Sequence, residues 1–135
     1  MANTTVPESH SDLLEAQIAT LATVGRDGRP QLSTVWFLAE DGVVRFSLHT
    51  DRQKVKNLRA NPAIGVHIQD PANPARYIEL RGDARIEADD DYVFANREGA
   101  KYGGVDLRAV DAGHGSRVVV TVEPVRINAV DMNAG

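Results

Sequence analysis

Arg52, Lys54 and Lys56 lie close together at the predicted start of a helix over residues 52–60, directly after a strand rich in hydroxyl side chains. No Asp or Glu occurs between residues 52 and 69, although the chain is acidic overall. The backbone N–H groups at a helix N-terminus favour acids nearby, so cations are unexpected there. Free N–H groups and several cations in one place are the components of a phosphate site. A solvated charged face is the alternative, because most charge runs have that role.

Other patterns that could carry chemistry are weaker. The chain has no Cys, which excludes a disulfide, a thiolate metal site and a Cys nucleophile. Its four His residues have no metal-ligand spacing, and His49 alone ends a strand beside the proposed phosphate site. Ser33 lacks the G-x-S-x-G surroundings of a serine hydrolase, and the segment around His114 lacks the strand and helix of a dinucleotide site. We therefore expect neither a nucleophilic catalytic residue nor a metal site.

The composition indicates one globular domain. The chain has 135 residues, of which 42% are apolar and 25% are charged, and both values are typical of globular proteins. A net charge of -4 argues against general nucleic-acid binding. No apolar run is long enough to span a membrane, and the polar start of the chain lacks the apolar core of a signal peptide. These observations predict a cytoplasmic protein with no membrane partner, composed of a flexible leader (residues 1–10) and one domain (residues 11–135).

Short alternating segments, separated by turns rich in Gly, Pro and Asp, predict a mostly β fold. A six-stranded antiparallel sheet of this size is expected to close into a barrel, because closure removes exposed strand edges. Gly82 is expected to mark a β-bulge. The expected strands cover residues 18–24, 31–39, 43–48, 63–69, 77–86 and 116–130, the expected helices residues 12–16, 52–60 and 92–102, and the expected loops residues 70–76 and 105–115.

Several segments together resemble a known family. They are Leu21-Ala22-Thr23-Val24, Asp27-Gly28-Arg29-Pro30, the strand from Gln31 to Phe37, and Arg52-Gln53-Lys54-Val55-Lys56-Asn57-Leu58 followed by Asn61-Pro62. From about Leu13 to Val130 the chain resembles the pyridoxamine 5'-phosphate oxidase-like split β-barrel superfamily. Within it, the chain is most similar to the small deazaflavin-dependent reductases, which use coenzyme F420. The resemblance implies a six-stranded antiparallel split β-barrel, the FMN-binding split barrel, that forms a homodimer with two cofactor sites at the subunit interface.

The resemblance also implies which residues bind the cofactor. It assigns the phosphate to Arg52, Lys54 and Asn57, with Lys56 nearby. The residues implied along the tricyclic ring are Gln31, Leu32, Ser33 and Thr34, and those implied beneath the side chain of the ring are Ser47, Leu48, His49 and Thr50. Tyr77 and Ile78 of the other subunit are implied at the ring edge or on the substrate side.

Coenzyme F420 presents a phosphodiester and an oligoglutamate tail, whereas FMN presents a single phosphate. The tail needs cations beyond the phosphate site, for which Arg26, Arg29, Lys56 and Arg59 are the candidates. Hydride chemistry resides in the ring, so such an enzyme needs no nucleophile and no metal. We expect an oxidoreductase that transfers hydride from reduced F420 to a small conjugated organic acceptor. The alternatives are an FMN-dependent enzyme of the same fold, a non-catalytic cofactor carrier, and a haem-binding protein that uses His49, His67 or His114.

Overall fold

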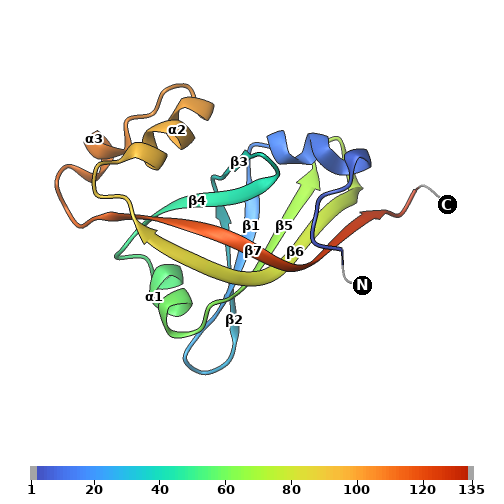
Figure 1. Cartoon of the computed structure of the whole chain (residues 1–135), viewed down its shortest axis with the longest axis horizontal. Coiled ribbons are helices and arrows are strands. Elements are labelled where there is room, and N and C mark those ends of the chain that lie inside the picture. The colour runs from blue at the N-terminus through green and yellow to red at the C-terminus, as the bar shows by residue number, and fades with distance from the viewer. Residues whose placement is uncertain (1–2, 134–135) are drawn as a thin grey trace.

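The computed structural model of the chain describes residues 3–133, which form one curled antiparallel sheet with short helices around it (Figure 1). The expected mostly β antiparallel fold is confirmed, with seven strands rather than six, in the order β2-β1-β5-β6-β7-β4-β3. The strands are β1 (Ala19–Val24), β2 (Pro30–Val35), β3 (Leu38–Glu40), β4 (Val43–His49), β5 (Ala63–Asp70), β6 (Asn73–Ala88) and β7 (Arg117–Asp131). The helices are the 3-10 helix η1 (Glu8–Glu15) and the α-helices α1 (Gln53–Ala60), α2 (Val93–Lys101) and α3 (Leu107–Asp111).

The two longest strands, β6 and β7, form a ribbon through the centre of the sheet. They pair with each other from Arg76, opposite Asp131, to Ala88, opposite Val118. β5 pairs with the first part of β6, and β4 pairs with the first part of β7, so these two strands join opposite ends of the ribbon. The twist of the long ribbon therefore turns the two flanks of the sheet toward each other, as the curl in Figure 1 shows.

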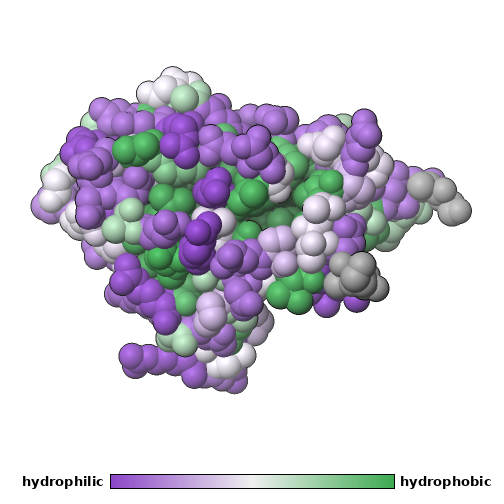
Figure 2. All heavy atoms as spheres, in the orientation of Figure 1, coloured by the Kyte–Doolittle hydropathy of each residue, from purple (hydrophilic) through white to green (hydrophobic). Residues whose placement is uncertain are grey.

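The hydrophobic core lies on the inner face of this curl. Alternate strand residues point inward, and Leu21, Phe46 and Ile68 are completely buried there. Helix α1 packs onto the core with Val55 and Leu58, which are three positions apart and so share one face of the helix. On the face seen in Figure 2, hydrophobic side chains still reach the surface in a hollow framed by hydrophilic ones. One sheet with few helices thus leaves part of its apolar surface uncovered.

The expected single strand over residues 31–39 is interrupted at Trp36 and Phe37. The Phe37 N–H donates to the Tyr102 hydroxyl at 3.0 Å, and the Phe37 carbonyl accepts from Lys101 Nζ at 2.9 Å. Trp36 stacks on Tyr102 with the ring centroids 4.1 Å apart. The end of α2 thus satisfies backbone groups that a neighbouring strand would otherwise pair. This contact, between segments distant in sequence, divides the expected strand into β2 and β3.

The chain packs onto the sheet earlier than expected. Helix η1 begins at Glu8, and His10 is buried, with its Nε2 3.0 Å from the Val130 carbonyl oxygen. Still earlier, the Asn3 carbonyl accepts from the Ile127 N–H at 2.6 Å. The expected flexible leader is therefore held against β7 in the part that the structure describes, while its first two residues lie outside that part.

Both expected loops contain regular structure. β6 begins at Asn73, so most of the expected loop over residues 70–76 belongs to a strand. The expected loop over residues 105–115 contains α3, which is capped by the carboxylate of Asp106 through two backbone N–H groups of its first turn. In the described part of the chain, no helix combines the length and the apolar composition that a membrane span requires.

The bulge expected at Gly82 is confirmed. The register between β6 and β7 shifts there, because Arg81 lies opposite Arg126 whereas Gly82 lies opposite Pro124. A Cβ atom at Gly82 would overlap the carbonyl group of Glu123 in the facing strand. Only glycine lets the two backbones approach so closely.

We expect Gly82→Ala to lower the free energy of unfolding by about 1–3 kcal/mol, because the new methyl group must displace the backbone of β7. Gly65→Ala is the matched control, since a Cβ there lies 3.5 Å from the Ala22 Cβ, an ordinary contact. Urea unfolding followed by circular dichroism measures both variants. Equal stability of the two would contradict the close approach at the bulge.

Candidate functional site

β4 has an edge that no strand covers beyond Arg45. β3 pairs with β4 only from Val43 to Arg45, so Ser47 and His49 face other elements on that side. The end of β2, the start of α1, and the helices α2 and α3 surround this edge and enclose a cleft of about 460 Å³. We call it the β4 cleft. Its polar lining includes Ser47, His49, Arg52, Lys54, Glu98, Asp111 and Arg117, and its apolar lining includes Trp36, Leu107 and Val110.

Arg52 and Lys54 form the cationic end of the β4 cleft. Arg52 is the N-cap residue of α1, and no side chain caps this helix, so its first N–H groups have no partner within the helix. Neither cation forms an ion pair within residues 3–133. Burial, followed by repulsion from the Arg52 guanidinium, lowers the pKa of Lys54. An anion bound at this end would relieve the repulsion and accept from the free N–H groups.

Ser47 adds an unpaired hydroxyl to the same cleft. The residue is 5% exposed, and its Oγ is the only buried side-chain polar atom among the described residues that lacks a hydrogen-bond partner. A buried hydroxyl without a partner costs about 1–3 kcal/mol. A ligand oxygen in the cleft would satisfy it.

Two carboxyl groups of the cleft have opposite environments. Glu98 is 1% exposed and forms no ion pair among the described residues, and its Oε1 accepts one hydrogen bond, from the Ser47 N–H at 3.1 Å. Burial raises the pKa of Glu98 to about 7. Asp111 accepts two hydrogen bonds from the Arg117 guanidinium, each 2.9 Å long, and one from the Tyr92 hydroxyl at 2.7 Å. These bonds, the Arg117 pair above all, lower the pKa of Asp111 to about 2.

The His49 ring attaches the loop after α3 to the end of β4. Its Nε2 lies 2.7 Å from the His114 carbonyl oxygen, and its Nδ1 accepts from the Asp51 N–H at 3.1 Å. In this arrangement Nδ1 is the acceptor of the ring, and Nε2 is placed to donate to the His114 carbonyl. A Cβ atom at Gly115 would overlap the ring, so glycine lets the loop lie directly against His49.

The structure brings part of the predicted cofactor site together in the β4 cleft, namely Thr34, Ser47, Leu48, His49, Arg52 and Lys54. Thr50 follows His49 but does not line the cleft, and its hydroxyl lies 3.3 Å from Ser116 Oγ. These predicted residues come from β2, β4 and the start of α1.

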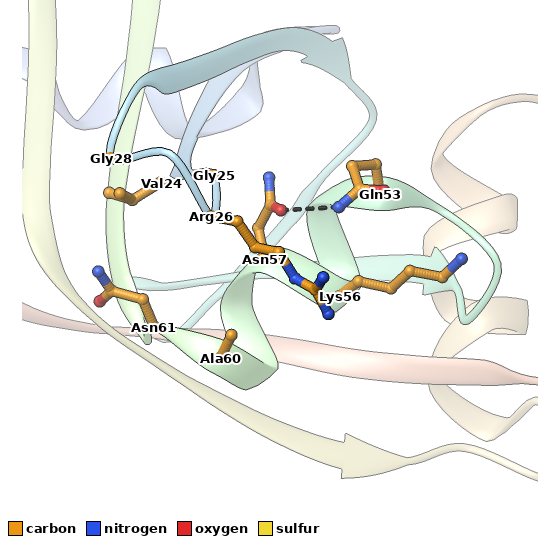
Figure 3. A pocket seen from close by; sticks show the side chains of 9 residues that line it. All are labelled: Val24, Gly25, Arg26, Gly28, Gln53, Lys56, Asn57, Ala60 and Asn61. Carbon is orange, nitrogen blue, oxygen red and sulfur yellow. Dashed lines mark hydrogen bonds between the residues drawn. The ribbon is translucent and has the colours of Figure 1, made fainter.

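Lys56 and Asn57 do not line the β4 cleft, contrary to the prediction of a single phosphate site. With Gln53 and Ala60 they form another face of α1, because these positions recur at spacings of three and four residues. This face lines a second pocket of about 640 Å³ together with the turn between β1 and β2 (Figure 3). Arg26 also lines this second pocket, whereas the other two candidate tail-binding cations, Arg29 and Arg59, do not.

The Asn57 side chain links α1 to two strands of the sheet, and its contact with a phosphate stays a prediction. It is 4% exposed, and its amide donates to Thr23 Oγ1 at 3.0 Å and to Gln31 Oε1 at 3.2 Å. Its Oδ1 accepts from Gln53 Nε2 at 2.9 Å (Figure 3). These bonds connect α1 with β1 and β2. They also occupy the Oε1 atom of Gln31, whose side chain was expected along the tricyclic ring of the cofactor. Ser33 shares the inward side of β2 with Gln31 and lies outside the cleft.

The remaining predicted residues lie on other surfaces. Leu32 and Tyr77 line a shallow depression of about 480 Å³ on the outer face of the sheet. The Ile78 side chain is completely buried in the core, so its contact with a cofactor stays a prediction for its backbone groups only. Strand alternation is the reason, because Tyr77 and Ile78 are neighbours and must point to opposite faces.

More than half of the residues that line the cleft were not predicted from the sequence as site residues. Most of the missed residues belong to the segment expected as a loop or to the start of β7, where nothing in the local pattern marks them. Glu98 had a local signal, because it shares the buried face of α2 with Phe94 and Ala95, where a charged side chain is unusual. The lining residues missing from the predicted cofactor site are Val35, Trp36, Glu98, Leu107, Val110, Asp111, His114 and Arg117.

Comparison with known proteins identifies the family. The profile of the pyridoxamine 5'-phosphate oxidase family matches residues 6–131, nearly the whole chain. The chain belongs to the pyridoxamine 5'-phosphate oxidase family. The curled sheet is accordingly the split barrel of this family, as predicted from the sequence. No curated protein sequence matches the chain.

Solved structures of family members resemble the chain closely. An F420 reductase is 38% identical over 91% of this chain and 98% of its own, with a TM-score of 0.80. The conserved hypothetical protein Rv2991 from Mycobacterium tuberculosis is 26% identical over 97% of this chain and 88% of its own, with a TM-score of 0.77. A pyridoxamine 5'-phosphate oxidase-like protein from Listeria innocua, 22% identical over 92% of this chain and 97% of its own with a TM-score of 0.71, shares the fold.

The buried carboxyl of Glu98 predicts a loss of stability with rising pH. Its pKa is about 7 in the folded protein and close to the ordinary 4.5 in the unfolded chain, so the folded state binds the extra proton. Its contribution to stability is full below pH 4.5 and is lost as the pH rises through 7. Between pH 5 and 8 we expect wild-type protein to lose roughly 2–3 kcal/mol of unfolding free energy relative to Glu98→Gln.

Urea unfolding of the wild-type protein and Glu98→Gln at several pH values measures this difference. Asp111 stays charged throughout the range, because its pKa is about 2. Parallel stability curves for the two proteins would show that Glu98 has an ordinary pKa.

Proposed function

We propose that this family member is an oxidoreductase that binds reduced coenzyme F420 and transfers hydride to a conjugated organic acceptor. The observation that carries the proposal is the meeting of two unpaired cations, Arg52 and Lys54, with the unpaired Ser47 hydroxyl in one cleft. The F420 reductase that is 38% identical over nearly the whole chain supports the choice of cofactor.

The residues of the β4 cleft fit a phosphodiester. Arg52 and Lys54 supply the positive charge, and the start of α1, which no side chain caps, adds backbone donors beside them. The Ser47 hydroxyl can donate to a further ligand oxygen. Of the two acidic side chains that line the cleft among the described residues, Asp111 is bonded to Arg117, and Glu98 carries a proton part of the time near neutral pH.

A planar ring fits the rest of the cleft. Thr34 and Trp36, at the end of β2, and Leu107 and Val110, from the α3 region, contribute to its lining. The bound deazaflavin supplies the hydride chemistry, while this chain binds the ring, orients it and excludes water from its face. The apolar α3 wall is the side on which we place the acceptor.

The second pocket favours F420 over FMN. Arg26 and Lys56 both line it, and it lies against another face of the same helix whose start lines the β4 cleft (Figure 3). A carboxylate tail that continues past α1 would meet these two cations, whereas FMN has no group to reach them. FMN remains the alternative cofactor, and the binding measurement decides between them.

We further propose that the protein is a homodimer that associates through the outer face of β2, β1, β5 and β6. The register aligns Leu32, Ala22, Gly65 and Arg81 in one row across these four strands. Leu32 is 68% exposed, and the small residues beside it leave the shallow depression on this face. Leu32 shares the outward side of β2 with Thr34 of the β4 cleft, so a second subunit on this face would also border the cleft.

Equilibrium titration with the two coenzymes tests the proposal. We expect added F420 to change its fluorescence on binding, and FMN to bind much more weakly. A purified protein that carries bound flavin and ignores F420 would support the FMN alternative. Binding of F420 without turnover of a panel of enones and quinones would support the cofactor carrier.

We expect Lys54→Ala to weaken F420 binding by about tenfold or more, because a charge-assisted hydrogen bond to the phosphate is lost. Its effect on unfolding free energy should stay within about 0.5 kcal/mol, since Lys54 has no ion pair to lose. Arg59→Ala is the control, an exposed cation of the same helix that lines neither pocket. Wild-type binding should also weaken as salt rises. If the Lys54→Ala variant bound F420 as tightly as the wild-type protein, Lys54 would not be a ligand of the phosphate.

We expect Leu32→Asp to shift the protein from dimer to monomer in sedimentation velocity, because it places a charge on the apolar face between subunits. Val93→Asp is the control, since Val93 is 60% exposed on α2, outside the depression. A wild-type protein that sediments as a monomer, or a Leu32→Asp variant that stays dimeric, would refute this interface.

A further inference from the structure

The geometry points to Glu98 as the residue that gives a proton to the acceptor in the β4 cleft. This inference rests on the proposed function and adds to it the acid that a hydride transfer to a conjugated acceptor requires. The carboxyl comes from α2, lies on the floor of the cleft and approaches the uncovered edge of β4.

The hydrogen bonding of Glu98 suits a carboxyl that holds a proton. One oxygen, Oε1, accepts from the Ser47 N–H, and this bond needs only an acceptor, which a neutral carboxyl also provides. No cation pairs with Glu98 in the described part of the chain, although the residue is 1% exposed. A buried carboxylate with a single backbone donor is costly, so burial favours the neutral acid.

The two cations near Glu98 form hydrogen bonds with other groups. Arg117 of β7 bonds to Asp111 of α3 through both Nε and Nη2. Lys101, on the same helix as Glu98, donates to the carbonyls of Ala16 and Phe37. Both cations attract the Glu98 carboxylate weakly, and burial outweighs them.

Most other titratable groups of the cleft are committed to other contacts, and His114 is the one further lining group that could compete as the acid. Asp111 is held as a carboxylate by Arg117 and Tyr92. Both ring nitrogens of His49, on β4, are hydrogen-bonded within the protein. Lys54 and Arg52, on α1, form the cationic end that the proposed phosphate occupies. When two carboxyl groups of one cleft have opposite environments, the one with the raised pKa is commonly the general acid.

Glu98 would complete the reduction at the end of the conjugated system opposite to the one that takes the hydride, which bound reduced deazaflavin would supply under the proposed function. The O–H bond of Glu98 breaks, and its proton forms a new C–H or O–H bond there, so the acceptor gains two electrons and two protons in total, and the deazaflavin is oxidised by two electrons. The Glu98 carboxylate that remains is protonated again from solvent through the cleft.

Carboxyl ¹³C NMR of the wild-type protein without cofactor tests whether Glu98 holds the proton. We expect one Glu resonance to titrate near pH 7, and Glu98→Gln to remove that resonance. A Glu98 midpoint near 4.5 would overturn the inference. This measurement needs neither F420 nor turnover, and Glu123→Gln, an exposed acid of β7, should leave the resonance in place.

Binding and turnover with F420 then separate this inference from the proposed function. Gln keeps the acceptor for the Ser47 N–H, so Glu98→Gln should bind F420 within about twofold of wild type. Its rate at pH 7, with the acceptor that wild type reduces fastest among enones and quinones, should fall about a hundredfold or more. The wild-type rate should fall as the pH rises through 7, and this dependence should vanish in Glu98→Gln.

Each other outcome has a definite meaning. A Glu98→Gln variant that binds F420 and keeps both the wild-type rate and its pH dependence would overturn the role of Glu98 and leave the proposed function standing. A wild-type protein that neither binds F420 nor reduces any acceptor of the panel would overturn both.

Discussion

The early end of the pairing between β3 and β4 is the constraint on which the candidate site depends. On the edge opposite β7, β4 has no strand neighbour after Arg45, so the backbone groups of Ser47 on that edge need other partners. Glu98 supplies one of them from α2, and the same helix ends in Lys101 and Tyr102, which hold the backbone of Phe37 where β2 stops. A continuous β2–β3 strand along β4 would fill the space that is now the cleft. Helix α2 therefore supplies a hydrogen-bond partner to the open edge of β4, and residues of both α2 and α3 line the cleft.

The short helix α1 has a different role on each of its faces. Val55 and Leu58 anchor it in the core, and the buried Asn57 connects it to β1 and β2. Because these contacts fix its rotation, Arg52 and Lys54 must face the β4 cleft, while Lys56 must face the second pocket. The cations are thus held at the β4 cleft by side chains on other faces of the same helix. A helix rotated by one residue would lose both the core contacts and the anion site.

The cleft combines groups that would be unfavourable elsewhere. It contains two cations without ion pairs, a buried hydroxyl without a partner and a buried carboxyl without a cation. Each costs free energy in the isolated chain, and an anionic ligand together with a protonated Glu98 would relieve most of that cost. Leu32, which is 68% exposed on the outer face of β2, is a further uncompensated feature that a second subunit would cover.

The mostly β fold, the bulge at Gly82 and the cationic helix start could be predicted from the sequence alone, because turn residues, strand alternation and local charge are properties of neighbouring residues. The family resemblance could be predicted as well, and the match over residues 6–131 confirms it. Which of the predicted residues meet in one cleft depends instead on how distant segments pack. Asn57 and Ile78 turn inward, Lys56 faces away from Lys54, and Glu98 arrives from a helix about fifty positions beyond Ser47. These outcomes depend on helix rotation and on contacts between distant segments, for which a local pattern carries no information.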